Sequence, residues 1–192
     1  VEADKVLLSI GRRPSTNGLG LENIGVNTER GAIKTDEQGR TNVAGVYAAG
    51  DVNGSHMLAH VAYRESEVAI NTILGKKDHM RYNAVPSVIY TNPEVACVGE
   101  TEESAKAKGM DVACVNLTMK YSVRYVAENE GGDGICKLII DKKRNRLVGV
   151  HMIGNYSSEI IVSAVTMIET EMRIEDIKEI IFPHPTVCEI IR

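Results

Sequence analysis

The arrangement of apolar and polar positions divides the chain into a loop-rich first part and a second part of strands and helices. In the first part, short apolar runs over residues 6–10 and 45–49 predict buried strands, and residues 12–33 predict mostly loop. Apolar residues at helical spacing predict a helix over residues 59–74, ended by Gly75. The polar residues 76–84 predict a linker, so we place a domain boundary near Met80.

The second part predicts an α+β fold, in which helices lie on one face of an antiparallel sheet. Apolar patterns predict strands over residues 87–90, 95–99, 111–119, 134–141 and 146–153. Thr101 predicts the N-cap of a helix, because two glutamates follow it in the first turn. Two more helices are expected over residues 157–172 and 174–181, and Pro183 stops the second.

Composition narrows the class of protein. The 192 residues are 43% hydrophobic and 25% charged, with a net charge of −4 and both signs interspersed. This balance favours no nucleic-acid or membrane partner, and no apolar run approaches the roughly 18 residues of a spanning helix. No signal peptide is visible, and the cysteines, expected to be free thiols, fit a cytoplasmic location. Because the first residue is Val, we expect a piece of a longer chain.

The four cysteines are widely and irregularly spaced, at positions 97, 114, 136 and 188. No Cys-x-x-Cys or Cys/His cluster occurs, so no metal site is expected. Cys97, Cys114 and Cys136 lie in apolar stretches and are expected to be small buried hydrophobic residues with free thiols. Cys188 is a minor candidate for a nucleophile.

The segment around His184 is the strongest candidate for chemistry. Pro183 and Pro185 flank the histidine and restrict its backbone, and Glu189 follows five residues later. A general base needs a fixed position, and a carboxylate can orient its imidazole. The alternative is a turn with a surface histidine and a solvated glutamate. We also expect the His184–Pro185 bond to be cis, since local packing can reverse the weak trans preference of X–Pro bonds.

A second group of candidates lies upstream. Asp51 follows Gly50 at the end of a predicted strand, where α/β sheets bind ligands, and its carboxylate can accept a hydrogen bond from a sugar-like hydroxyl. Residues 57–60 begin the next helix, whose free N–H groups carry partial positive charge. The alternatives are an Asx turn at Asp51 and ordinary core or capping roles for residues 57–60.

Taken together, these segments resemble the C-terminal part of the pyridine nucleotide–disulfide oxidoreductases, and most resemble the dihydrolipoamide dehydrogenase group. The resemblance is carried by Gly11-Arg12-Arg13-Pro14, Thr41 to Val52, Met57-Leu58-Ala59-His60, Thr91-Asn92-Pro93-Glu94-Val95-Ala96 and His184-Pro185-Thr186. The chain departs from the group at Tyr121-Ser122-Val123-Arg124, where members often carry Ala-Asn-x-Arg.

The resemblance implies roles for individual residues. It implies that His184 and Glu189 form the catalytic acid–base pair. Asp51 would bond the ribityl chain of FAD, and the other implied cofactor-binding residues are Gly11, near NAD, and Gly50, Met57, Leu58, Ala59 and His60. Residues 1–79 would be the C-terminal part of the FAD/NAD-binding region and residues 80–192 the dimerisation domain.

The implied function is oxidation of protein-bound dihydrolipoamide with NAD, by a homodimer that serves 2-oxo acid dehydrogenase or glycine cleavage complexes through their lipoyl-bearing subunits. The sequence holds no Gly-x-Gly-x-x-Gly and no cysteine pair four residues apart, so we expect this chain alone to be inactive. The alternatives are another flavoprotein disulfide reductase and a non-catalytic dimerisation module.

Overall fold

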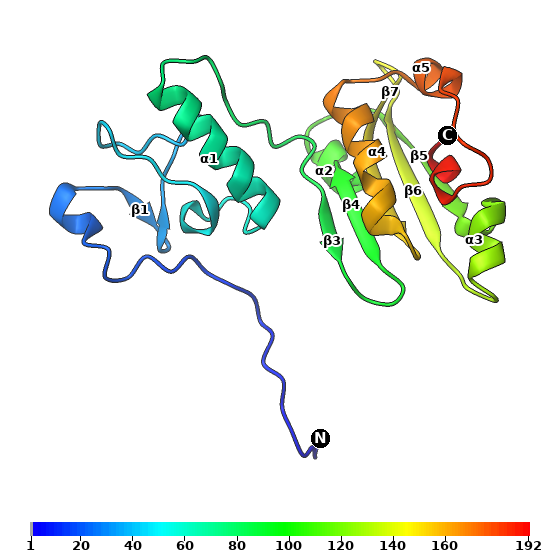
Figure 1. Ribbon diagram of the computed structural model, residues 1–192, viewed down its shortest axis with the longest axis horizontal. Coiled ribbons are helices and arrows are strands. Elements are labelled where there is room, and N and C mark those ends of the chain that lie inside the picture. Colours follow the sequence, from blue (N-terminus) through cyan, green and yellow to red (C-terminus); the bar gives the residue numbers. More distant parts are fainter. Residues whose placement is uncertain (1) are drawn as a thin grey trace. The chain divides into compact units, whose positions relative to one another are not determined.

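The computed structural model describes residues 2–192 and divides the chain into two compact units, Val1–Arg81 and Tyr82–Arg192 (Figure 1). The first unit contains η1 (Leu21–Ile24), β1 (Thr28–Glu29), β2 (Ala32–Ile33), η2 (Gly50–Asn53) and α1 (Ala59–Ile73). The second contains β3 (Ser87–Ile89), β4 (Val95–Gly99), α2 (Glu102–Ala107), β5 (Val112–Thr118), η3 (Met119–Tyr121), α3 (Val123–Glu128), β6 (Ile135–Asp141), β7 (Arg146–Ile153), α4 (Ser157–Glu169), α5 (Ile174–Glu179) and η4 (Val187–Ile191). The assignment of cofactor binding to the first part and dimerisation to the second stays a prediction.

The helix α1 is the main element of the first unit, and it matches the predicted range. The two predicted strands are wrong. Residues 6–10 form no strand, and their large apolar side chains are 78–90% exposed. Residues 45–49 contribute only an isolated bridge between Tyr47 and Arg40. A strand needs a hydrogen-bonded neighbour, and among residues 2–192 neither segment has one along its length.

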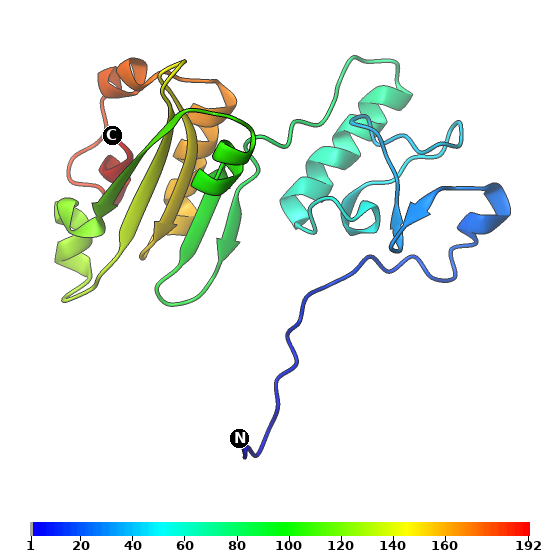
Figure 2. The same cartoon turned by 180° about the vertical axis from the view of Figure 1, so that it is seen from behind.

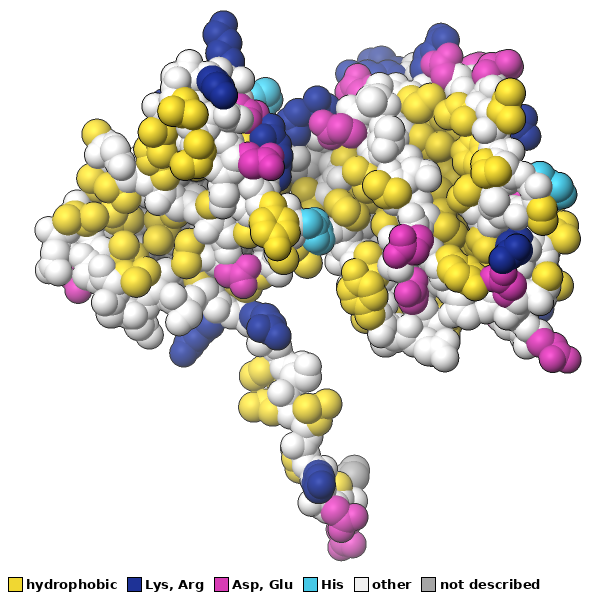
Figure 3. Space-filling model, in the orientation of Figure 1, with side chains coloured by type: hydrophobic (Ala, Val, Ile, Leu, Met, Phe, Trp, Pro, Cys, Tyr) yellow, Lys and Arg dark blue, Asp and Glu magenta, His cyan; other side chains and the backbone are white. Residues whose placement is uncertain are grey.

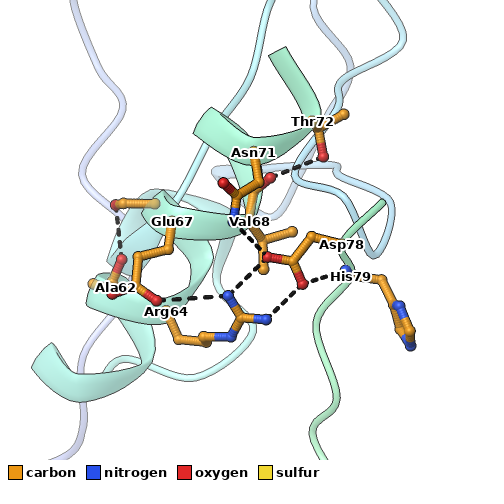
Figure 4. Close-up of polar contacts among 9 residues, drawn as sticks. Ala62, Arg64, Glu67, Val68, Asn71, Thr72, Asp78 and His79 are labelled. Carbon is orange, nitrogen blue, oxygen red and sulfur yellow. Dashed lines mark hydrogen bonds and ion pairs between the residues drawn. The ribbon is translucent and has the colours of Figure 1, made fainter. Parts of the chain in front are cut away.

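A cluster of polar side chains ties the segment after α1 back to that helix (Figure 4). Arg64 donates through both terminal nitrogens to the carboxylate of Asp78, at 2.9 and 2.5 Å. Asn71 and the backbone N–H of His79 also donate to Asp78, at 2.8 and 2.9 Å. The Arg64 guanidinium, as the largest cause, holds the pKa of this carboxyl far below its ordinary value. The first residues of the predicted linker are therefore fixed to α1.

The second unit is built on a five-stranded antiparallel sheet with the strand order β3-β4-β7-β6-β5. The helix α4 packs against β4 and β7 on one face. Figure 2 shows α2 in front of the opposite face, where Lys137 of β6 forms an ion pair with Glu102 at 2.8 Å. The α+β fold and its antiparallel sheet are confirmed, but the helices do not all lie on one face. The short helix α3 and the turn η4 were not predicted.

Burial separates the predicted core cysteines. Cys136 on β6 is fully buried in the core of the second unit, and burial raises the pKa of its thiol to about 12. Cys97 and Cys114 are only half-buried, so the prediction is wrong for them. The physical reason is the alternation of side chains along a strand. Ala96 and Val98 occupy the core face of β4, and Cys97 between them points to the other.

Two X–Pro bonds are cis. The His184–Pro185 bond is cis as predicted, and the Asn92–Pro93 bond is cis without having been predicted. Within residues 2–192, no helix combines the length and apolar character needed to cross a bilayer.

The packing of β7 gives a testable prediction. Val150 is fully buried in the central strand, whereas Val115 on the edge strand β5 is 37% exposed. Val150→Ala should lower the free energy of unfolding of the second unit by about 2–3 kcal/mol, because it removes buried methyl groups and leaves a cavity. Val115→Ala, the matched control, should cost less than about 1 kcal/mol. Urea unfolding followed by circular dichroism measures both, and equal losses would contradict this account of the core.

Candidate functional site

The histidine predicted for chemistry is exposed and contacts the predicted glutamate. The His184 side chain is 69% exposed, and its Nδ1 lies 3.0 Å from Oε1 and 3.2 Å from Oε2 of Glu189. With Nδ1–H donating to the carboxylate, Nε2 is left as the proton acceptor. The structure therefore brings together the two residues that the sequence paired.

Glu189 is itself held by the backbone. Its Oε2 accepts a hydrogen bond from the N–H of Thr186 at 2.8 Å, within a capping box at the start of η4. This N–H first, and His184 second, lowers the pKa of the Glu189 carboxyl below its ordinary value of 4.5. The buried Val187, Ile190 and Ile191 fix η4 to the unit. The carboxylate that orients the imidazole is thus charged at neutral pH and firmly placed.

Two hollows flank this segment. A small one of about 160 Å³ is lined by His184 and Glu189 together with Tyr121 and Ser122. A larger one of about 530 Å³ lies between α4 and the C-terminal segment, where Figure 3 shows hydrophobic side chains gathered. Cys188 lines the larger hollow, with its Sγ 3.2 Å from the hydroxyl of Thr186. A hydroxyl is not the base that activates a thiol, so this contact gives no support to Cys188 as a nucleophile.

In the first unit, Asp51 lies on the turn η2, outside any strand. Gly50 before it has φ +79°, and a Cβ there would lie 3.1 Å from that of Ala62 on α1, so this turn requires glycine. Asp51 is exposed, and among residues 2–192 no group donates a hydrogen bond to its carboxylate. The carboxylate is therefore open to a ligand.

A residue that the sequence analysis missed supports this turn. Glu65 on α1 is 2% exposed, and its Oε2 accepts hydrogen bonds from the N–H of Gly50 at 2.6 Å and from the Asn53 side chain at 2.9 Å. Nothing in the polar run around Glu65 distinguishes it from the exposed Arg64 and Glu67 on either side. Only the helical spacing from Val61 and Val68 could have indicated an inward-facing position.

The remaining predicted residues of the first unit divide into two groups. Met57 and Leu58 are half-buried and precede α1, and Ala59 and His60 are exposed in its first turn. This turn contains no acidic residue, which leaves the positive end of the helix uncompensated. Gly11 is exposed with φ +113°, and a Cβ there would meet nothing within 4 Å, so the structure does not bring it to the other predicted residues.

Two family models match the chain. Residues 85–192 match the dimerisation domain of pyridine nucleotide-disulphide oxidoreductases, and residues 1–66 match the pyridine nucleotide-disulphide oxidoreductase model.

The chain is similar to curated dihydrolipoyl dehydrogenases and to solved structures of flavoprotein disulfide reductases. The mitochondrial dihydrolipoyl dehydrogenase of Pisum sativum is 39% identical over all of this chain and 38% of its own length. The dihydrolipoyl dehydrogenase of Bacillus subtilis is 40% identical over 99% of this chain and 40% of its own. The structure of the HOCl-induced flavoprotein disulfide reductase RclA from Escherichia coli is 28% identical with a TM-score of 0.84, over 94% of this chain and 42% of its own. The chain thus spans about two fifths of the length of these relatives.

The contacts of Glu189 predict how its carboxyl titrates. Its pKa should be below 4.5 in this chain, and in His184→Ala it should rise but stay below 4.5, because the N–H of Thr186 remains. Because the folded pKa is lower than the unfolded one, the charged carboxylate stabilises the fold at any pH above the ordinary pKa of 4.5. This stabilisation is lost as the pH falls through the lower pKa of the folded state. Carboxyl ¹³C NMR measures the titration, with His79→Ala as the control. A wild-type pKa at or above 4.5 would contradict the geometry.

Proposed function

We infer the function of this chain from the premise that it belongs to the pyridine nucleotide-disulphide oxidoreductase family. We propose that it is the C-terminal portion of a dihydrolipoyl dehydrogenase, an enzyme that oxidises protein-bound dihydrolipoamide with NAD. The observation that carries the proposal is the exposed His184–Glu189 pair, fixed by Thr186 on a buried turn. Its support from outside the structure is the 39–40% identity with curated dihydrolipoyl dehydrogenases along the whole chain.

The chemistry assigned to the pair is proton transfer. His184 takes the proton of a substrate thiol at Nε2, which leaves a thiolate and an imidazolium. Glu189 accepts the hydrogen bond from Nδ1–H throughout, so it holds the tautomer and stabilises the positive ring. A thiolate is the nucleophile in thiol–disulfide exchange, and the disulfide that it attacks would lie outside this chain.

The first unit fits a flavin nucleotide on two observations. The Asp51 carboxylate is exposed and accepts no hydrogen bond from residues 2–192, as a ligand for ribityl hydroxyls requires. The first turn of α1, with Met57 to His60 around it, offers a positive helix end without a competing acidic residue. FAD, when bound, supplies the electron relay between thiols and NAD. We assign Asp51 and Gly50 to its ribityl side, residues 57–60 to its ring and Gly11 to the NAD side.

We further propose a homodimer as the active assembly, and as partners the lipoyl-bearing subunits of 2-oxo acid dehydrogenase or glycine cleavage complexes. The dimerisation-domain match supports the homodimer. The exposed Ile181, just before the catalytic segment, and Val162 on α4 are apolar surface that a second copy would cover.

A second candidate is another flavoprotein disulfide reductase, favoured by the structural likeness to RclA. Met57-Leu58-Ala59-His60 favours the dihydrolipoyl dehydrogenase. A non-catalytic dimerisation module is the third. The full-length protein separates them: it reduces NAD with dihydrolipoamide, or consumes a different disulfide, or does neither.

The role of His184 is tested in that full-length protein. His184→Gln should slow dihydrolipoamide oxidation by roughly 10²–10⁴-fold, the loss typical of a missing general base, while FAD stays bound. His79→Gln changes the same residue type in an exposed place and should leave the rate unchanged. A His184→Gln enzyme within a few fold of wild type would remove His184 from the mechanism.

The assembly is tested in the 192-residue chain itself. We expect a dimer at high micromolar concentration by sedimentation velocity, and a monomer after Ile181→Glu, because a buried charge without a partner is costly at an interface. Ile24→Glu alters another exposed isoleucine, in the first unit, and should leave the dimer intact. A wild-type monomer would count against a dimer formed through the second unit.

A further inference from the structure

Thr186 organises the segment that carries the acid–base pair, through hydrogen bonds of its backbone and its side chain. Its N–H donates to Glu189, and its hydroxyl donates to the carbonyl of Pro183 at 2.7 Å. Its carbonyl accepts a hydrogen bond from the hydroxyl of Ser122 at 3.2 Å. The first two bonds lie within the segment, whereas the third joins Thr186 to Ser122, 64 residues away in sequence.

Ser122 is a firm point of attachment. Ser122 is 4% exposed and lies at the junction of η3 and α3. Its hydroxyl also accepts a hydrogen bond from the N–H of Tyr125 at 3.2 Å. Its own N–H donates to the carbonyl of Met119 at 2.9 Å. Met119 and Tyr125, which precede and follow Ser122, are at most 2% exposed. The hydroxyl therefore accepts one hydrogen bond, from Tyr125, and donates one, to Thr186, so its orientation is fixed.

His184 depends on such an attachment, because little else holds it. In the part of the chain that the structure describes, the ring forms hydrogen bonds only to Glu189. Ser122 lines the same 160 Å³ hollow as His184 and Glu189, and the other titratable groups at this hollow are Tyr121 and Arg192. A shift of the Thr186 backbone would move the Glu189 carboxylate and, with it, the imidazole.

We propose that Ser122 is a positioning residue for the acid–base pair: through the carbonyl of Thr186 it fixes the N–H that holds Glu189, and so fixes His184. The catalytic consequence rests on the function proposed above, whereas the structural link does not. The resemblance to dihydrolipoamide dehydrogenases breaks at this serine, so this chain uses a short hydroxyl where the group often carries asparagine.

The first experiment uses the 192-residue chain and needs no activity. In Ser122→Ala we expect the Glu189 pKa to rise toward 4.5 by ¹³C NMR, and the single Nδ1–H tautomer of His184 to become mixed by ¹⁵N NMR. Ser104→Ala is the matched control, because Ser104 also accepts a helix-capping hydrogen bond in this unit but does not contact Thr186. Both values should be unchanged in the control.

Ser122→Cys serves where Ser122→Ala does not fold. It nearly keeps the volume and replaces the hydroxyl by a weak donor, so the same two changes should appear in smaller measure. Wild-type values of the Glu189 pKa and the His184 tautomer in a folded variant would overturn the proposal, whatever the enzyme does.

The second experiment uses the full-length protein. Ser122→Ala should lower kcat for dihydrolipoamide oxidation about tenfold, within the up to 10²-fold cost of an ångström of misplacement, with KM for NAD unchanged. Unchanged kcat with altered NMR signals would overturn the catalytic part of the proposal. A wild-type enzyme that does not oxidise dihydrolipoamide would instead reject the proposed function, and the NMR result on Ser122 would stand.

Discussion

Burial of the central strand β7 is the constraint on which the second unit depends. This strand is paired on both sides, and its Leu147, Val150 and Met152 are at most 2% exposed. Gly149 allows the chain to pass the carbonyl of Glu100, because a Cβ there would lie only 2.0 Å from that oxygen. With β7 fixed, α4 packs against it and η4 packs against α4 and β6. The exposed His184 is therefore carried by a segment whose two ends are anchored in this core.

Local signals predicted the elements that are defined by their own residues. Thr101 caps α2 through Ser104, and the apolar spacing of α1 and α4 found both helices within a few residues of their ends. Features that depend on a distant part of the chain could not be predicted. The apolar run at residues 6–10 looks like a strand but has no partner here, and Cys97 differs from Cys136 only by the face that it occupies.

The candidate site shows the same division. His184 and Glu189 could be paired from the sequence because they lie five positions apart and two prolines restrict the backbone of His184. Ser122 could not, since its partner Thr186 lies 64 residues away. For Glu65 the helical spacing from Val61 and Val68 could have indicated an inward-facing position, but its hydrogen bond to the N–H of Gly50 is visible only in the folded structure. In both units a carboxylate accepts a hydrogen bond from a backbone N–H and contacts a side chain, Gly50 and Asn53 for Glu65 and Thr186 and His184 for Glu189.

The exposed segment at residues 6–10 has a consequence for how this chain behaves in concentrated solution. Among residues 2–192 this segment has no strand partner, and its four large apolar side chains are exposed, so it resembles an unprotected sheet edge. Two copies could add to one another there as strands, independently of any contact through the second unit. Self-association of the chain would then have two different causes: specific assembly through the second unit, and strand addition at residues 6–10 as the first step of aggregation. The specific assembly stops at two copies, whereas strand addition does not.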